Sequence, residues 1–174
     1  MRKGAISLIV LVVLLLAACG KPAPQIPSQR KSSAPTVDSA ALALMELNQQ
    51  LAMTADQQLA QFAQTQEDPY ALYEANTWMY ISERGDTDSP SPAPEEEWTV
   101  HMRTYTLAGE LLIDTEGSYR IGKCELPQAV DANMSELHHG AKVRLLAPWY
   151  SAYGLHGTDA VPPYENVIIE LELK

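Results

Sequence analysis

The chain has 174 residues, with 12 basic against 22 acidic side chains and a net charge of −10. This balance lacks the Lys/Arg clusters that nucleic-acid phosphates require, so we expect no nucleic-acid partner. It also argues against electrostatic docking on anionic lipid.

Residues 1–18 have the layout of a secretion signal. A short basic segment, MRK, precedes an apolar run from Ile6 to Leu16 that is too short for a stable transmembrane helix. Small residues then stand directly before Cys19, an arrangement that resembles the bacterial lipoprotein signature. We therefore expect cleavage before Cys19, acylation of its thiol and membrane attachment through the acyl chains. An ordinary signal peptide with an incidental cysteine is the alternative.

The residues after Cys19 suggest where the protein resides. Gly20 stands where an Asp would suggest retention in the inner membrane, so attachment to the outer membrane of a bacterial cell envelope is favoured. Residues 19–37 are rich in Pro, Ser, Gln and Lys and predict a flexible tether. Cys124 has no disulfide partner once Cys19 is acylated, and we expect it to be a half-buried small side chain.

Two helices are predicted within a helical prefix at residues 38–69. Three leucines, at positions 44, 47 and 51, recur at i, i+3 and i+7, the spacing of one helix face. Thr54 followed by Gln57 predicts a capping box that opens the second helix. Packing of this prefix on the rest of the chain is favoured over self-association or partner binding.

Residues 70–174 are predicted to form one domain that begins with strands. Residues 78–81 suit a short strand buried on both sides. Residues 84–97 are rich in Gly, Asp, Pro and Glu and predict a loop. Alternating apolar residues then predict strands at 98–107 and 111–121, with a turn at Gly109 between them.

One short helix is predicted between these strands and the last ones. Val130, Met134 and Leu137 recur at i, i+4 and i+7, with Pro127 in the first turn and Gly140 just past the end. An antiparallel sheet curved around this amphipathic helix would bury the apolar faces of both, so the fold class is α+β with a helical segment before it.

Residues 140–173, GAKVRLLAPWYSAYGLHGTDAVPPYENVIIELEL, carry a family resemblance. The Gly-x-Lys-x-Arg-Leu strand start, Ala152-Tyr153-Gly154 and Val161-Pro162-Pro163 with an alternating apolar run after it resemble the end of an FKBP-type peptidyl-prolyl cis–trans isomerase. More weakly, residues 70–97 resemble the strand and loop that lead into lipoprotein members of this family from Bacteroidetes-like bacteria. The resemblance implies an FKBP-like fold and a prolyl isomerase that acts on proline-containing polypeptides.

The resemblance also implies an apolar pocket. Tyr153 matches the tyrosine whose hydroxyl contacts the substrate, and Asp114 lies one position after the place of the family's aspartate, so both are expected to be catalytic. The expected substrate-binding residues are Leu112, Leu126, Val130, Val161, Ile169, Tyr119 and Met102.

Several of these residues depart from the family pattern. Leu112, Val130 and Ile169 are aliphatic where the family has aromatic rings, and Met102 replaces a tyrosine. The position of Pro127 is one whose backbone N–H binds the ligand in the family, and proline has no N–H. Tyr119, Trp149 and Tyr150 are candidates to refill the pocket with aromatic rings. We expect weak activity.

Two functions therefore stay open. The first is a lipid-anchored isomerase, or folding chaperone, that assists the folding of cell-envelope proteins. The second is a binding or scaffold lipoprotein that kept the fold without catalysis, with dimerisation or partner binding through the helices at 38–64. No cofactor or metal is expected, because adjacent residues such as His138 and His139 point apart and no third ligand has zinc-like spacing.

Overall fold

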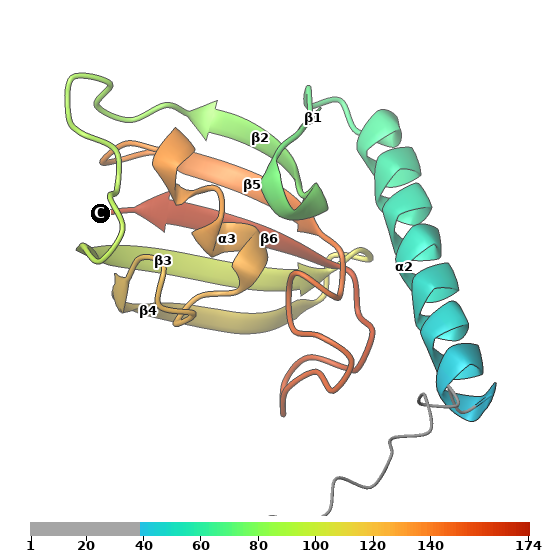
Figure 1. The fold of residues 1–174 in the computed structure, drawn as a ribbon. Coiled ribbons are helices and arrows are strands. Elements are labelled where there is room, and N and C mark those ends of the chain that lie inside the picture. The colour runs from blue at the N-terminus through green and yellow to red at the C-terminus, as the bar shows by residue number, and fades with distance from the viewer. Residues whose placement is uncertain (1–38) are drawn as a thin grey trace, which may run out of the picture. The chain divides into compact units, whose positions relative to one another are not determined.

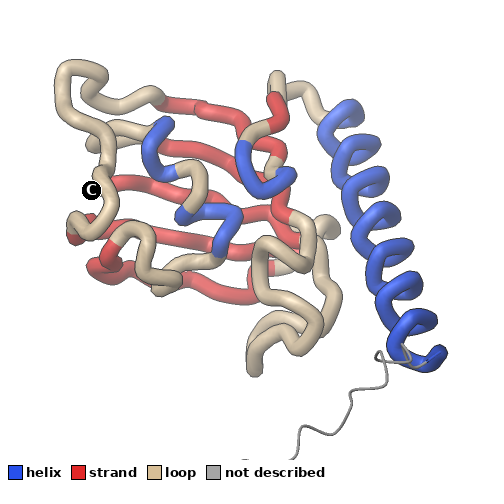
Figure 2. The backbone as a smooth tube through the Cα atoms, in the orientation of Figure 1, coloured by secondary structure: helices blue, strands red, loops and turns tan. Residues whose placement is uncertain are grey.

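The computed structural model describes residues 39–174, so the predicted signal peptide, Cys19 and the tether lie outside the described residues. The described part contains a six-stranded antiparallel sheet with the strand order β1-β2-β5-β6-β3-β4 (Figures 1 and 2). The strands are β1 (Ala71–Leu72), β2 (Trp78–Glu83), β3 (Glu97–Thr106), β4 (Leu111–Arg120), β5 (Lys142–Ala147) and β6 (Val167–Leu173).

The short helix α3 (Gln128–Asp131) covers one face of the sheet, which we call the inner face (Figure 1). Alternate residues of β3 and β6 point to this face and form one apolar cluster with Val130 and Met134. In this cluster Val100, Ile169 and Met134 are 0% exposed. The predicted α+β class, an antiparallel sheet around a short amphipathic helix with a helix before it, is confirmed.

The long helix α2 (Ser39–Thr65) packs on the opposite, outer face. Leu59, Ala63 and Leu146 form a second buried cluster there, against which the half-buried Trp78 and Ile168 pack. Because strand side chains alternate between faces, Trp78 contacts α2 while its neighbour Met79 lies in the inner cluster. The start of β2 is therefore covered on both faces, but Tyr80 and Ile81 are partly exposed, so the prediction of a strand buried on both sides is confirmed only in part.

The prefix is one helix, and the prediction of two was wrong. Thr54 lies inside α2, where its hydroxyl donates a hydrogen bond of 2.8 Å to the carbonyl oxygen of Gln50. A threonine can bond the carbonyl four residues back without ending the helix. The Thr54–Gln57 spacing therefore matches the sequence pattern of a capping box although no helix begins there.

The predicted helix at 127–137 is divided into α3 and a 3₁₀ turn, η2 (Met134–Glu136). Asn133 separates them, with φ −107° and ψ 1°. Its buried amide nitrogen donates 2.7 Å to the carbonyl of Ala129, and its amide oxygen accepts 3.1 Å from the N–H of Glu74, in the 3₁₀ turn η1 (Glu74–Asn76). This side chain competes with helical backbone bonds and ties η1 to α3.

Two predicted turn glycines have the expected backbone. Gly109 and Gly140 have φ of +88° and +79°, the left-handed region that glycine adopts without steric cost. Cys124 also lies in this region, with φ 58°, and its side chain is exposed. The prediction that Cys124 is half-buried was wrong, because it lies in the turn between β4 and α3.

Candidate functional site

Tyr153 lies in a tight turn that follows β5, at the border of the inner cluster. The N–H of Ala152 donates to the carbonyl of Pro148 at 3.1 Å, and that of Gly154 donates to the carbonyl of Trp149 at 2.7 Å. The ring of Tyr153 is half-buried and packs against the inner cluster. The turn thus presents a phenol to the apolar face of the sheet.

The hydroxyl of Tyr153 has a buried partner. It lies 2.8 Å from the hydroxyl of Thr104, a β3 residue that is 0% exposed. Burial raises the pKa of Tyr153, the hydrogen bond with Thr104 opposes this rise, and the nearby phenol of Tyr119 adds to it. The hydroxyl is therefore neutral at pH 7 and is held at a defined position.

Most of the predicted pocket residues lie together with Tyr153. Five of them belong to the buried part of the inner cluster, each 5% exposed or less: Met102, Leu126, Val130, Val161 and Ile169. Leu112 and Tyr119 pack against this cluster and are partly exposed. The structure therefore brings these seven side chains and Tyr153 to one face, with a buried aliphatic floor and a partly exposed rim.

The register of the sheet explains this grouping. Thr104 pairs with Ile169 on β6 and with Ile113 on β4, so these three side chains share the inner face. Tyr119 stands further along β4, and its ring lies over Gly117, where an added Cβ would come within 3.3 Å of the phenol oxygen. The glycine leaves the space that Tyr119 occupies on the rim.

Asp114 does not join the site, and its predicted place beside Tyr153 is corrected here. It is paired across the strands with Arg103, and its carboxylate lies 2.7 Å from Nε2 of His101. The alternation along β4 puts Ile113 on the inner face and Asp114 on the outer one. The resemblance was off by one residue, and in a strand one residue reverses the face.

Two other predicted aromatic residues also point elsewhere. The ring of Trp149 contacts Tyr150 and Tyr164, with centroids 5.4 and 4.8 Å apart. The hydroxyl of Tyr150 donates to the carboxylate of Asp56 on α2. Of the three candidates to refill the pocket with aromatic rings, only Tyr119 packs against the inner cluster.

The loop after Tyr153 carries Val161 back into the core. The N–H of Thr158 donates 2.8 Å to the carbonyl of Val161, and the N–H of Val161 donates 3.0 Å to the hydroxyl of Thr158. Gly157 makes this closure possible, because its φ is +63° and a Cβ there would lie 2.2 Å from the Val161 carbonyl oxygen. The loop is thus a closed turn with Val161 1% exposed at its base.

The start of α3 is held close to the Tyr153 turn. The N–H of Ala129 donates 2.8 Å to the carbonyl of Ser151, and the carbonyl of Pro127 accepts from the N–H of Val130 at 2.9 Å. Pro127 itself has no N–H for a ligand, as the sequence predicted. Thr104 is a site residue that the sequence patterns did not predict. The sequence feature that could have indicated it is a polar residue at a position of β3 where the alternation predicts an inward-facing side chain.

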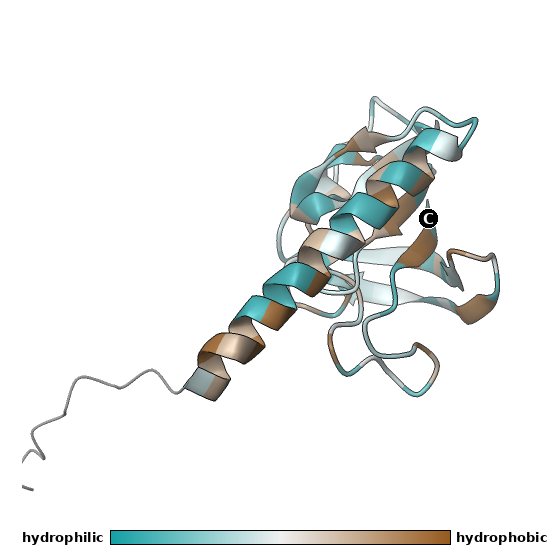
Figure 3. Cartoon of the chain, turned by 90° about the vertical axis from the view of Figure 1, so that its right-hand side faces the viewer, coloured by the Kyte–Doolittle hydropathy of each residue, from teal (hydrophilic) through white to brown (hydrophobic). Residues whose placement is uncertain are grey.

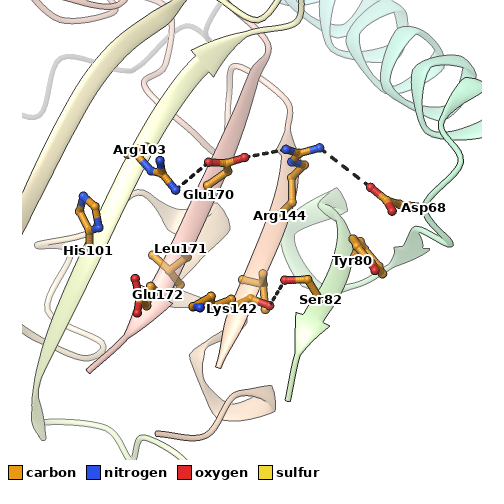
Figure 4. Close-up of a pocket in the computed structure, with 11 residues that line it drawn as sticks. Asp68, Tyr80, Ser82, His101, Arg103, Lys142, Arg144, Glu170, Leu171 and Glu172 are labelled. Atoms are coloured by element: carbon orange, nitrogen blue, oxygen red, sulfur yellow. Dashed lines mark hydrogen bonds and ion pairs between the residues drawn. The ribbon is translucent and has the colours of Figure 1, made fainter. Parts of the chain in front are cut away.

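The outer face holds a polar hollow of about 250 Å³ (Figure 4). Glu170 lies at its centre between Arg103 and Arg144, at 3.1 and 2.6 Å. Partial burial would raise the pKa of Glu170, but hydrogen bonds from Arg144 and Tyr105 and the charges of both arginines lower it. Arg144 also lies 3.9 Å from the carboxylate of Asp68, so the charges of two arginines and two carboxylates balance in this hollow.

Within residues 39–174, no group of three or more His, Cys, Asp or Glu side chains is arranged to hold a metal ion. Over the same residues, no helix has both the length and the apolar character needed to cross a membrane.

The sequence matches no protein-family model, and no curated protein matches it. Its structure is similar to the 1.6 Å crystal structure of a peptidyl-prolyl cis–trans isomerase from Pseudomonas syringae pv. tomato, with a TM-score of 0.60. The two sequences are 19% identical, and the match covers 71% of this chain and 92% of that one. The chain therefore has a peptidyl-prolyl-isomerase-like fold.

Proposed function

We propose that this chain is a lipid-anchored peptidyl-prolyl cis–trans isomerase of the FKBP type that assists folding of proteins in the bacterial envelope. The observation that carries the proposal is the Tyr153 hydroxyl, fixed 2.8 Å from Thr104 above an apolar floor. Leu112, Tyr119 and Tyr153 would surround the proline ring, and Val130, Val161 and Ile169 would lie beneath it.

The reaction needs only this kind of surface. Rotation about an X-Pro amide has a barrier of roughly 18–20 kcal/mol because it breaks the amide resonance. The twisted amide has lost charge separation, so it suffers less than the planar amide from an apolar, water-poor surface. A hydroxyl that holds the substrate carbonyl then favours the twisted form over both planar forms. No nucleophile, metal or cofactor takes part.

The same residues predict a slow enzyme. The floor is aliphatic, whereas aromatic rings would offer larger and stiffer apolar surfaces to the proline ring. Pro127 also offers no N–H to a bound peptide. We therefore expect a measurable but low kcat/KM.

A second candidate is a binding or scaffold lipoprotein without catalysis. The observation that favours it is the burial of Met102 at 5% and Val130 at 1% exposure, which leaves the floor tightly packed. In this case polypeptides would bind elsewhere on the molecule, and Tyr153 would only close the core.

An isomerisation assay separates the two candidates. We expect the full chain in detergent to accelerate the cis–trans relaxation of peptides with different residues before proline. Tyr153→Phe should lower kcat/KM by about tenfold, the value of one lost hydrogen bond of about 1.4 kcal/mol. Tyr80→Phe removes a phenol hydroxyl from the outer face and should leave the rate unchanged.

Two results would decide against isomerase activity at this site. If a folded sample accelerates none of the peptides, the scaffold candidate replaces the first. If Tyr153→Phe and Tyr80→Phe have equal effects, the activity does not arise at the inner face.

The lipid anchor at Cys19 has its own test. We expect cells fed a labelled fatty acid to incorporate the label into the full chain and not into Cys19→Ser, which should leave the membrane fraction. Cys124→Ser is the matched control and should be labelled normally. Label that persists in Cys19→Ser would rule out this anchor.

A further inference from the structure

Apolar residues are frequent in the N-terminal half of α2 (Figure 3). Many of their side chains are exposed. Of the ten large hydrophobic residues that are exposed in the described part of the chain, six lie within twelve residues of this helix. They are Leu42, Leu44, Met45, Leu47, Leu51 and Met53, at 53, 57, 67, 51, 36 and 55% exposure. Exposed apolar surface of this density marks an interaction site.

The rest of the molecule leaves this segment uncovered. The contacts that hold α2 to the outer face are made by its C-terminal half, through Ala55, Leu59 and Ala63. The helix extends past the sheet towards its N-terminus (Figure 3). The docked C-terminal half therefore sets the direction in which the exposed half projects.

Three of the exposed residues form a regular stripe. Leu44, Leu47 and Leu51 occupy the a, d and a positions of a heptad pattern, the arrangement with which two helices interlock. A second line through Leu42 and Met45 continues to Gln49, where it becomes polar. The leucine stripe is the longer uninterrupted apolar line.

The low charge of this segment favours a second copy of the same helix, rather than a membrane surface, as its binding partner. Residues 39–53 contain a single charged side chain, Glu46, and no Lys or Arg. Helices that lie on lipid surfaces depend on basic residues along the polar face, so a membrane surface is a poor partner. A second copy of the same helix offers an apolar stripe of the same length and places no charge in the contact.

The position of the segment in the chain sets the orientation. Ser39 follows the proposed anchor Cys19 by 20 residues, which extend to at most about 70 Å. Two copies anchored in one leaflet would both start from the membrane side. We propose that the leucine stripe of α2 pairs in parallel with the same stripe of a second copy of this chain. The orientation rests on the proposed anchor, whereas the contact does not depend on isomerase activity.

The contact is expected to be weak in dilute solution. A segment of 15 residues is about 22 Å long, and the stripe it carries is shorter than that of a stable coiled coil. Anchoring in one membrane raises the effective concentration of the copies and compensates for the small interface. Pairing would place two inner-face sites on one unit.

Cysteine cross-linking in the intact envelope tests the proposal. The full chain with Cys124→Ser receives one new thiol, either Leu47→Cys at the d position or Gln49→Cys on the opposite side of the helix. Under a mild oxidant, we expect Leu47→Cys to form a disulfide-linked homodimer several-fold more than Gln49→Cys. The chain with Cys124→Ser alone shows any link made through Cys19.

A second pair of changes tests the stripe. Leu44→Gln with Leu51→Gln should reduce the Leu47→Cys link several-fold. Both leucines are exposed, so the unfolding midpoint should not move. Equal linking at Leu47→Cys and Gln49→Cys, or a product whose mass contains another protein, would overturn the proposal.

Discussion

Thr104 places a fully buried hydroxyl among the apolar side chains of the inner cluster. A buried hydroxyl without a partner would lower stability, and the partner here is the phenol of Tyr153 at 2.8 Å. Thr104 lies in a strand and Tyr153 in a turn 49 residues later, so the pair also pins that turn to the sheet. One hydrogen bond therefore serves both the packing of the core and the orientation of the proposed catalytic group.

The substitution Thr104→Val tests this pair. Valine nearly preserves the shape of threonine but removes the hydroxyl, and the hydrogen bond with Thr104 is what opposes the rise of the Tyr153 pKa. We therefore expect the Tyr153 pKa to rise further in Thr104→Val, as followed by NMR titration of the tyrosine ring, and kcat/KM for prolyl isomerisation to fall.

Thr104→Ser is the matched control, because it keeps the hydroxyl and removes only a methyl group. It should restore both the pKa and the activity. An unchanged pKa of Tyr153 in Thr104→Val would show that this hydroxyl does not position the phenol.

At the scale of elements, polar contacts hold α2 to the loops beside the site. The hydroxyl of Tyr150 donates to the carboxylate of Asp56, and the amide of Asn166 donates 2.9 Å to the side chain of Gln58. Asn166 also accepts 2.9 Å from the N–H of Trp149, at the start of the turn that carries Tyr153. The helix is thus linked to the candidate site through a short chain of hydrogen bonds.

This link predicts how stability depends on alkaline pH. Burial, with the hydrogen bond to Asp56, raises the pKa of Tyr150 to about 12 from the usual 10.0. The folded state therefore holds this proton more tightly than the unfolded state, so its contribution is complete below pH 10 and is lost as the pH rises towards 12. After allowance for solvent screening, the contribution is on the order of 1 kcal/mol.

Urea unfolding at pH 8 and at pH 11.5 measures this contribution. The free energy of unfolding should fall more steeply with pH in the native chain than in Tyr150→Phe, which lacks the titrating group. Other tyrosines and the lysines titrate equally in both chains, so their effects cancel in the comparison. An equal fall in the free energy of unfolding in both chains would contradict a stabilising role for the Tyr150 proton.

At the scale of the whole molecule, the two faces of the sheet carry different kinds of side chain. The inner face buries an aliphatic core with Tyr153 packed at its border, whereas the outer face carries the Arg103–Glu170–Arg144 ion pairs and the docked part of α2. The proposed catalytic surface and the proposed pairing surface therefore lie on different elements. A substitution in the leucine stripe should leave the inner face unchanged.

The sequence predicted much of the fold because the periodicity of apolar residues is a local property. The alternation in β2 and β3, the apolar spacing at 130, 134 and 137, and the turn at Gly109 all correspond to observed structure. Where a side chain competes with the backbone, local patterns were less informative. Asn133 divided the predicted helix, and Thr54 failed to cap one.

The sequence by itself determined the α+β class, because burial in a strand or helix follows from the spacing of apolar residues, and its resemblance to a known family indicated most of the apolar residues that line the inner face. Only the tertiary structure decided what the polar groups do. Strand register turned Asp114 towards His101, and a contact across 49 residues joined Thr104 to Tyr153. Tyr150 reached α2 in the same way, across 94 residues. Hydrogen bonds are directional and join residues distant in the chain, so periodicity does not encode them.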